Sequence, residues 1–201
     1  MGVLVFMLAL LPMGGASSMH LMRAESPGPS VGKLVPKVRS TAKILYEIYS
    51  FLTIVLMILL VISGCPVFDS INLAFATAGT GGFAVLNSSA ADYNAATQWI
   101  LTIFMILFGV NFNVYFLFYV KKWKDGLRCE EARAYFGIIL GSVALISFNI
   151  YHLVRNVELT VRQAAFQVAS IITTTGFGSA DFDQWPEFSK CILVLLMFIG
   201  A

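Results

Sequence analysis

Charged residues are scarce in this chain. Thirteen basic and eleven acidic residues make up 12% of its 201 residues, about half of the roughly 25% that soluble domains carry. Hydrophobic residues account for 58%. This composition excludes a soluble globular domain, a disordered tail and a nucleic-acid-binding module. It is typical of a polytopic membrane protein built from α-helices.

Cysteine and histidine are scarce as well. Cys65, Cys129 and Cys191 lie far apart, with no Cys-x-x-Cys pair and no neighbouring histidine, which excludes a zinc site or disulfide framework that spacing could reveal. The mid-membrane segments also lack the paired titratable groups that an intramembrane enzyme needs. The sequence therefore predicts neither an enzyme nor a bound cofactor.

Long charge-free stretches are what the chain has instead. A helix needs about 20 apolar residues to cross the hydrocarbon core. The sequence predicts spanning helices in four such stretches: 1–22, 48–68, 93–120 and 134–154. A further apolar run extends from Cys191 to Ala201. The stretch 1–22 also has the alternative of a signal peptide, although it lacks a basic n-region.

The basic residues predict which connections are cytoplasmic. Segments 23–43 and 121–133 hold ten lysines and arginines, whereas 69–92 and 155–190 hold three. By the positive-inside rule, the first two segments are cytoplasmic and the last two face outward. The N-terminus is then outside.

The charge-free stretch 70–91 differs from the others because it is rich in small residues and poor in large aliphatic ones. We interpret it as a short re-entrant helix followed by a loop. Irregular backbone at membrane depth is tolerated only where protein or a water-filled cavity surrounds it. An extramembrane loop of small residues is the alternative.

The same layout occurs twice. The stretches 69–98 and 158–187 each begin with a candidate helix cap, Asp69-Ser70 in one and a Thr160/Gln163 capping box in the other. Each then reaches a Thr-x-Gly-Phe motif, and the two motifs lie 94 residues apart, at 80–83 and 174–177. Repeats indicate architecture. The predicted unit is a helix, a short re-entrant helix, a Thr/Gly turn and a second helix.

A Thr/Gly turn at the end of a short helix suits cation chemistry. Backbone carbonyls can replace the water around a dehydrated alkali cation, and glycine allows the conformations that turn them inward. The negative end of the helix dipole also points at such a turn. A phosphate site has the opposite order, with the loop preceding the helix.

These motifs resemble those of one family. The segment SIITTTGFGSADFDQWP (170–186) is similar to the third pore loop of the Trk/Ktr/HKT superfamily of potassium transporters, in its bacterial TrkH/TrkG branch. The segment FATAGTGGF (75–83) resembles that branch's second pore loop, and MRAESPGP (22–29) its cytoplasmic linker. The resemblance implies potassium uptake across the bacterial inner membrane by helix–pore loop–helix repeats around one pore. It also implies a homodimer and a cytosolic nucleotide-binding regulator of the TrkA type.

Carried onto this sequence, the resemblance places K⁺ ligands in two turns. They are Gly79, Thr80, Gly81 and Gly82 in the earlier repeat and Thr173, Thr174, Thr175 and Gly176 in the later one. Phe83 and Phe177 follow these turns and are expected to pack behind the filter. No other metal or cofactor is implied.

The resemblance also divides the chain. The expected parts are an inner helix of a first repeat (1–22), a cytoplasmic linker (23–43), the earlier repeat (44–120), a second linker (121–133) and the later repeat (134–201). One pore loop and a fourth repeat of the family pattern have no counterpart, so we expect a truncated chain. The alternative is a non-transporting truncated membrane fragment or an assembly subunit that needs partner chains.

Two further sets of polar residues carry predictions. Asn111 and Asn113 lie in the stretch 93–120 and either line the pore or form hydrogen bonds between helices. Glu158 and Arg162 lie four residues apart, a spacing that favours an ion pair on one helix face.

Overall fold

The computed structural model describes residues 38–111, 114–115 and 130–200. The chain divides into two compact units, one of Met1–Leu52 with Val110–Arg133 and the other of Thr53–Gly109 with Ala134–Ala201. The expected segment 1–22 and most of the expected linkers 23–43 and 121–133 lie outside the described residues. The predicted turns 79–82 and 173–176 both belong to the second unit.

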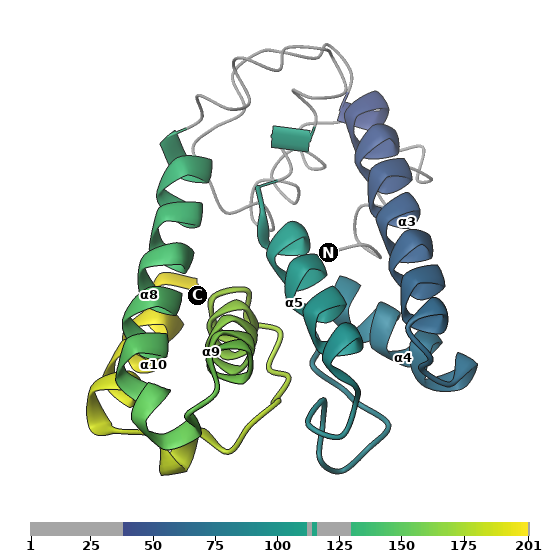
Figure 1. Ribbon diagram of the computed structural model, residues 1–201. Coiled ribbons are helices and arrows are strands. Elements are labelled where there is room, and N and C mark those ends of the chain that lie inside the picture. Colours follow the sequence, from purple (N-terminus) through teal and green to yellow (C-terminus); the bar gives the residue numbers. More distant parts are fainter. Residues whose placement is uncertain (1–37, 112–113, 116–129, 201) are drawn as a thin grey trace. The chain divides into compact units, whose positions relative to one another are not determined.

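Regular structure in the described residues is entirely helical (Figure 1). The helices are α3 (Val38–Ile62), α4 (Val67–Ala78), α5 (Ala95–Gly109), α8 (Glu130–Val154), α9 (Val157–Ile172), the 3₁₀ turn η1 (Phe182–Gln184) and α10 (Glu187–Gly200). No strand occurs among these residues, as the composition predicts.

Two long helices occur among the described residues, and each precedes a shorter helix. The segment Ile44–Ile62 of α3 and the whole of α8 are long and apolar enough to cross a membrane, and most of their surface is not covered by the rest of the described chain. Each is followed by a shorter helix, α4 with 12 residues and α9 with 16. Neither reaches the about 20 residues that a span requires, so the layout predicted for both repeats is present.

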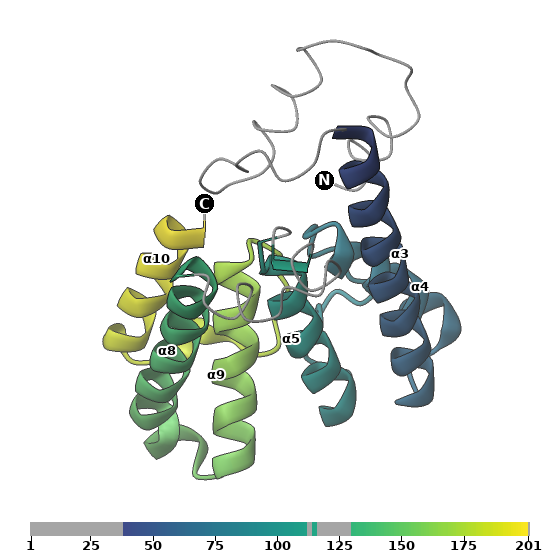
Figure 2. The same ribbon diagram turned by 90° about the horizontal axis from the view of Figure 1, so that it is seen from above.

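The half-helix α9 lies at the centre of the second unit. It packs against α5 on one side and α10 on the other, while α4 packs against α5 (Figures 1 and 2). Its neighbours α8 and α10 share with it a buried cluster that includes Ile146, Ile150, Val168, Ile172 and Leu193. This packing holds the C-terminal end of α9 in place, where the 173–176 turn begins.

Both predicted helix caps are wrong. The helix α4 begins after Pro66, whose position carries no side-chain cap, and Asp69 lies inside its first turn. The cap of α9 lies four residues before the expected Thr160, since the side chain of Asn156 accepts from the N–H of Leu159. An extended Asn at this position satisfies an unpaired amide of the first turn.

The sequence predicts one continuous helix over the stretch 93–120. This prediction is wrong, because α5 ends at Gly109. The hydroxyl of Tyr135 donates to the carbonyl of Ile106 at 3.1 Å. The last carbonyls of a helix lack partners within it, and this tyrosine supplies one. A Cβ on Gly109 would lie only 2.5 Å from the same hydroxyl oxygen, so glycine permits the close approach.

Candidate functional site

The turns 79–82 and 173–176 have similar backbone conformations at three equivalent positions. The first residues, Gly79 and Thr173, have φ values of −82° and −90°. The second residues, Thr80 and Thr174, have values of 48° and 56°. The fourth residues, Gly82 and Gly176, have values of 65° and 88°. The pattern repeats with the 94-residue offset of the sequence motif. The internal repeat is therefore a repeat of main-chain geometry.

The N–H groups of both turns donate back to their own half-helix. In the earlier repeat, the amides of residues 79, 80 and 81 donate to the carbonyls of residues 75, 77 and 76 at 2.8, 3.1 and 2.8 Å. In the later repeat, the amides of residues 173, 174 and 175 donate to those of 169, 171 and 170 at 3.1, 3.0 and 2.9 Å. These partners are equivalent in sequence, so each turn closes its helix in the same way.

The carbonyl oxygens of the turns accept no hydrogen bond from the described part of the chain. Among the hydrogen bonds of the described residues, none ends on a carbonyl oxygen of residues 79–82 or 173–176. A left-handed φ at a β-branched residue such as Thr80 or Thr174 is a genuine outlier, and such strain gathers at functional sites. The turns thus present acceptors and carry backbone strain.

The structure brings the two turns together. A Cβ on Gly82 would overlap the carbonyl oxygen of Thr175, so the two backbones touch. Just beyond the turns, the N–H of Ala90 donates to the carbonyl of Gly178 at 2.8 Å. The N–H of Gly178 in turn donates to the hydroxyl of Ser89 at 3.1 Å.

Hydroxyl groups stiffen the later turn. Thr173 donates its hydroxyl to the carbonyl of Ala169 at 2.7 Å, and the hydroxyl oxygens of Thr173 and Thr175 are 2.8 Å apart. A hydroxyl has one proton, so Thr175 is the donor of the second bond. Both side chains are buried, whereas Thr174 and Gly176 are exposed.

The two phenylalanines behave differently. Phe177 is 1% exposed, and the carbonyl of this residue accepts from the hydroxyl of Ser170 at 2.7 Å. Phe83 is 80% exposed, so the expectation that it packs behind its turn is not met within the described residues. Its ring lies beside Gly81 instead, where a Cβ would be 3.1 Å from the ring edge.

The polar residues outside the turns have local partners. Asn111 donates to the carboxylate of Glu131 at the start of α8 at 2.9 Å, which favours the hydrogen-bonding alternative over pore lining. Asn113 lies outside the described residues. The predicted ion pair of Glu158 and Arg162 is confirmed at 3.5 Å.

Sequence reasoning missed three residues that organise the loop after the earlier turn, namely Ser89, Gln98 and Tyr93. Gln98 is buried and donates to the carbonyls of Ala90, Ala91 and Tyr93 at 2.9–3.2 Å. The phenol of Tyr93 donates to Asp69 at 2.8 Å, and burial together with this bond raises the pKa of Tyr93 well above its ordinary value. Gln98 is a polar residue inside an otherwise apolar helix, and this pattern could have indicated a buried hydrogen-bonding role.

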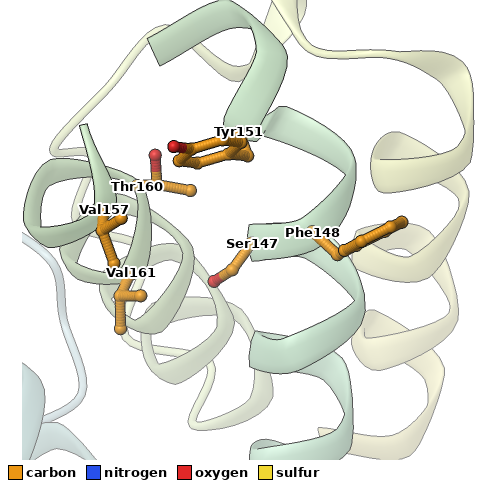
Figure 3. A pocket seen from close by; sticks show the side chains of 6 residues that line it. All are labelled: Ser147, Phe148, Tyr151, Val157, Thr160 and Val161. Atoms are coloured by element: carbon orange, nitrogen blue, oxygen red, sulfur yellow. The ribbon is translucent and has the colours of Figure 1, made fainter. Parts of the chain in front are cut away.

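A hollow of about 250 Å³ lies away from the turns, between α8 and the beginning of α9 (Figure 3). Its walls are Ser147, Phe148, Tyr151, Val157, Thr160 and Val161. These side chains are mostly apolar, and none carries a charge, so the hollow offers no cation site.

The sequence matches a family described as TrkH, cation transport protein, over residues 1–201. The chain belongs to the TrkH family. Family membership makes it an all-α polytopic membrane protein of a transport family and not an enzyme. The spans α3 and α8 and the half-helices α4 and α9 fit that architecture.

Named TrkH relatives cover the whole chain. It is 35% identical over 206 residues to the Trk system potassium uptake protein TrkH of Salmonella typhimurium and 34% identical over 209 residues to that of Escherichia coli K12. The TrkG protein of Escherichia coli K12 is 28% identical. The chain spans 43% of the length of the two TrkH relatives.

A solved structure shows the same fold. The potassium transporter TrkH from Vibrio parahaemolyticus matches with a TM-score of 0.78 and 27% identity. The match covers 100% of this chain and 42% of the other.

Proposed function

We propose that this chain takes part in potassium uptake across the bacterial inner membrane. In this proposal the carbonyl oxygens of residues 79–82 and 173–176 replace part of the water shell of K⁺. The relatives named above are potassium uptake proteins of the Trk system, which supports K⁺ as the ion.

The repeated turn geometry carries the proposal. In each turn the first three N–H groups donate to the preceding half-helix, and none of the carbonyl oxygens accepts a hydrogen bond from the residues that the structure describes. Carbonyl oxygens are the ligands of potassium filters, and the negative dipole ends of α4 and α9 favour a cation at the same place. The C-terminal end of each half-helix therefore supplies both the carbonyl ligands and the negative electrostatic field that favours a cation.

Two turns provide only part of a coordination shell. A filter layer needs ligands from four sides, so two further sides must come from other repeats or from partner chains. We expect a homodimer and a cytosolic nucleotide-binding regulator of the TrkA type. The expected division into an earlier repeat (44–120) and a later repeat (134–201) belongs to the same proposal.

A test is growth at low potassium. The complete reading frame that encodes these residues is expressed in a bacterium deficient in potassium uptake, with and without Gly176→Asp. The wild type should restore growth. The variant should not, because a carboxylate beside the turn binds the cation too tightly and residue 176 has a φ of +88°.

The matched control is Asn87→Asp, which places the same charge on the exposed loop that follows the earlier turn. It should restore growth like the wild type, with equal amounts of each protein in the membrane. Growth of the Gly176→Asp strain would reject the filter role. Failure of the wild type would favour the alternative of a non-transporting subunit.

A further inference from the structure

The segment that follows the 173–176 turn is held by the earlier repeat. Both main-chain groups of Gly178 are bonded there: its carbonyl accepts from Ala90 at 2.8 Å, and its N–H donates to the Ser89 hydroxyl at 3.1 Å. Ala90 is fully buried, so the first bond is shielded from water. We call these three residues the inter-repeat clamp.

The earlier repeat braces its side of the clamp. Gln98, which is 5% exposed, donates from α5 to the carbonyls of Ala90 at 2.9 Å and Ala91 at 3.2 Å. Ser89 has a φ of +57°, a conformation that serine adopts rarely. The loop therefore holds the hydroxyl of Ser89 in a fixed place at the cost of local strain.

The clamp lies close to the turn that it would control. Gly178 is two residues beyond Gly176, and the intervening Phe177 is buried, with its carbonyl bonded to Ser170 at 2.7 Å. The segment between clamp and turn is thus short and fixed. Gly82 also touches Thr175, so the earlier repeat contacts the later turn itself and the segment just after it.

We propose that Ser89 and Gln98 are positioning residues that set the carbonyl oxygens of the 173–176 turn from the neighbouring repeat. This inference rests on the proposed function of the turn as a set of ion ligands. Ligand sets must be held within about 0.5 Å to work. Loss of the Ser89 hydroxyl therefore loosens the later turn and weakens its preference for K⁺ over Na⁺.

The test compares two adjacent serines in the complete reading frame. Ser89→Ala removes the acceptor of the Gly178 amide, and Ser89→Gly does so while accommodating the positive φ. The control is Ser88→Ala, because the Ser88 hydroxyl is exposed and bonds only to Asp92, at 2.6 Å, among the hydrogen bonds of the described chain. All three variants shorten a serine side chain in the same loop.

Two measurements separate the possible roles. Hydrogen exchange of the purified protein should be about fivefold faster at the Gly178 amide in both Ser89 variants, as expected for one lost hydrogen bond. The ratio of K⁺ to Na⁺ uptake in proteoliposomes should fall by about two- to fivefold. The Ser88→Ala protein should match the wild type in both measurements.

Each contrary result overturns the inference. Unchanged exchange at Gly178 would show that the clamp does not hold in the membrane protein. Faster exchange with an unchanged uptake ratio would limit the clamp to stabilising the fold. In either case Gly176→Asp would still abolish uptake if the filter proposal is correct, so the two failures are distinguishable.

Discussion

Thr80 and Thr174 lie 94 residues apart in sequence and adopt the same left-handed backbone, with φ values of 48° and 56°. A left-handed conformation costs an L-residue with a side chain about 1–2 kcal/mol. Glycine would avoid this cost, yet both repeats have threonine here. The strain is therefore a property of the turn and occurs in both copies.

Replacement of Thr174 by glycine should lower the stability of the protein less than replacement of Thr175 by glycine. In Thr174→Gly, relief of the left-handed strain offsets the roughly 1 kcal/mol entropic cost of glycine. Thr175→Gly has no such relief and also loses the hydrogen bond to Thr173, so it should cost about 2 kcal/mol. Thermal unfolding in detergent measures both. Equal destabilisation would mean that the positive φ of Thr174 is not strained.

The contact between Gly82 and Thr175 should make Gly82 intolerant of any side chain. A Cβ there would overlap the Thr175 carbonyl oxygen, and its φ of +65° disfavours other residues. We expect Gly82→Ala to abolish potassium-dependent growth rescue. Gly137→Ala is the matched control, because a Cβ at Gly137 meets nothing within 4 Å, and its rescue should equal that of the wild type. Normal rescue by Gly82→Ala would contradict the close approach of the turns.

The equivalent phenylalanines should differ in their contribution to stability. Phe177 is 1% exposed and Phe83 is 80% exposed. Phe177→Ala leaves a cavity and should lower the free energy of unfolding by about 3 kcal/mol or more. Phe83→Ala should change it by less than about 0.5 kcal/mol. Denaturant unfolding of the purified chain would show this, and similar losses in both variants would mean that Phe83 is also buried.

Local motifs were predictable from the sequence, and long-range contacts were not. The paired Thr-x-Gly-Phe motifs predicted two equivalent turns because the turn conformation depends on residues within it and in the preceding helix. The helix starts were wrong because Pro66 and Asn156 determine them, whereas the prediction used the Ser and Thr residues that follow. Ser89 gave no signal, because nothing in a loop of small residues indicates a partner 89 positions away.

The exposure of Phe83 shows a second reason for failure. The motif is the same in both repeats, but burial depends on which elements cover it. In the later repeat, Phe177 precedes a segment that is bonded to the earlier repeat through Gly178. The earlier repeat has no equivalent bond in the described residues. Sequence symmetry therefore predicts the backbone of the turns and not the surroundings of their side chains.

The end of α5 should be sensitive to one added methyl group. A Cβ on Gly109 would lie 2.5 Å from the hydroxyl oxygen of Tyr135 and 2.6 Å from Cγ2 of Thr173. Such overlap in a packed interior costs about 1–3 kcal/mol. We expect Gly109→Ala to lower the unfolding temperature in detergent, although alanine favours a helix more than glycine does. Gly141→Ala, which meets nothing within 4 Å on α8, should not lower it.

Removal of the two obstructing atoms should restore stability to Gly109→Ala. Tyr135→Phe deletes the hydroxyl, and Thr173→Ser deletes the methyl group while keeping the hydroxyl that donates to Ala169. Tyr135→Phe alone should cost about 1 kcal/mol, since it loses the bond to the Ile106 carbonyl. Combined with Gly109→Ala, the two substitutions should recover most of the lost stability, because contacting residues are not additive. Strictly additive losses in the triple variant would mean that Gly109 does not pack against the base of the 173–176 turn.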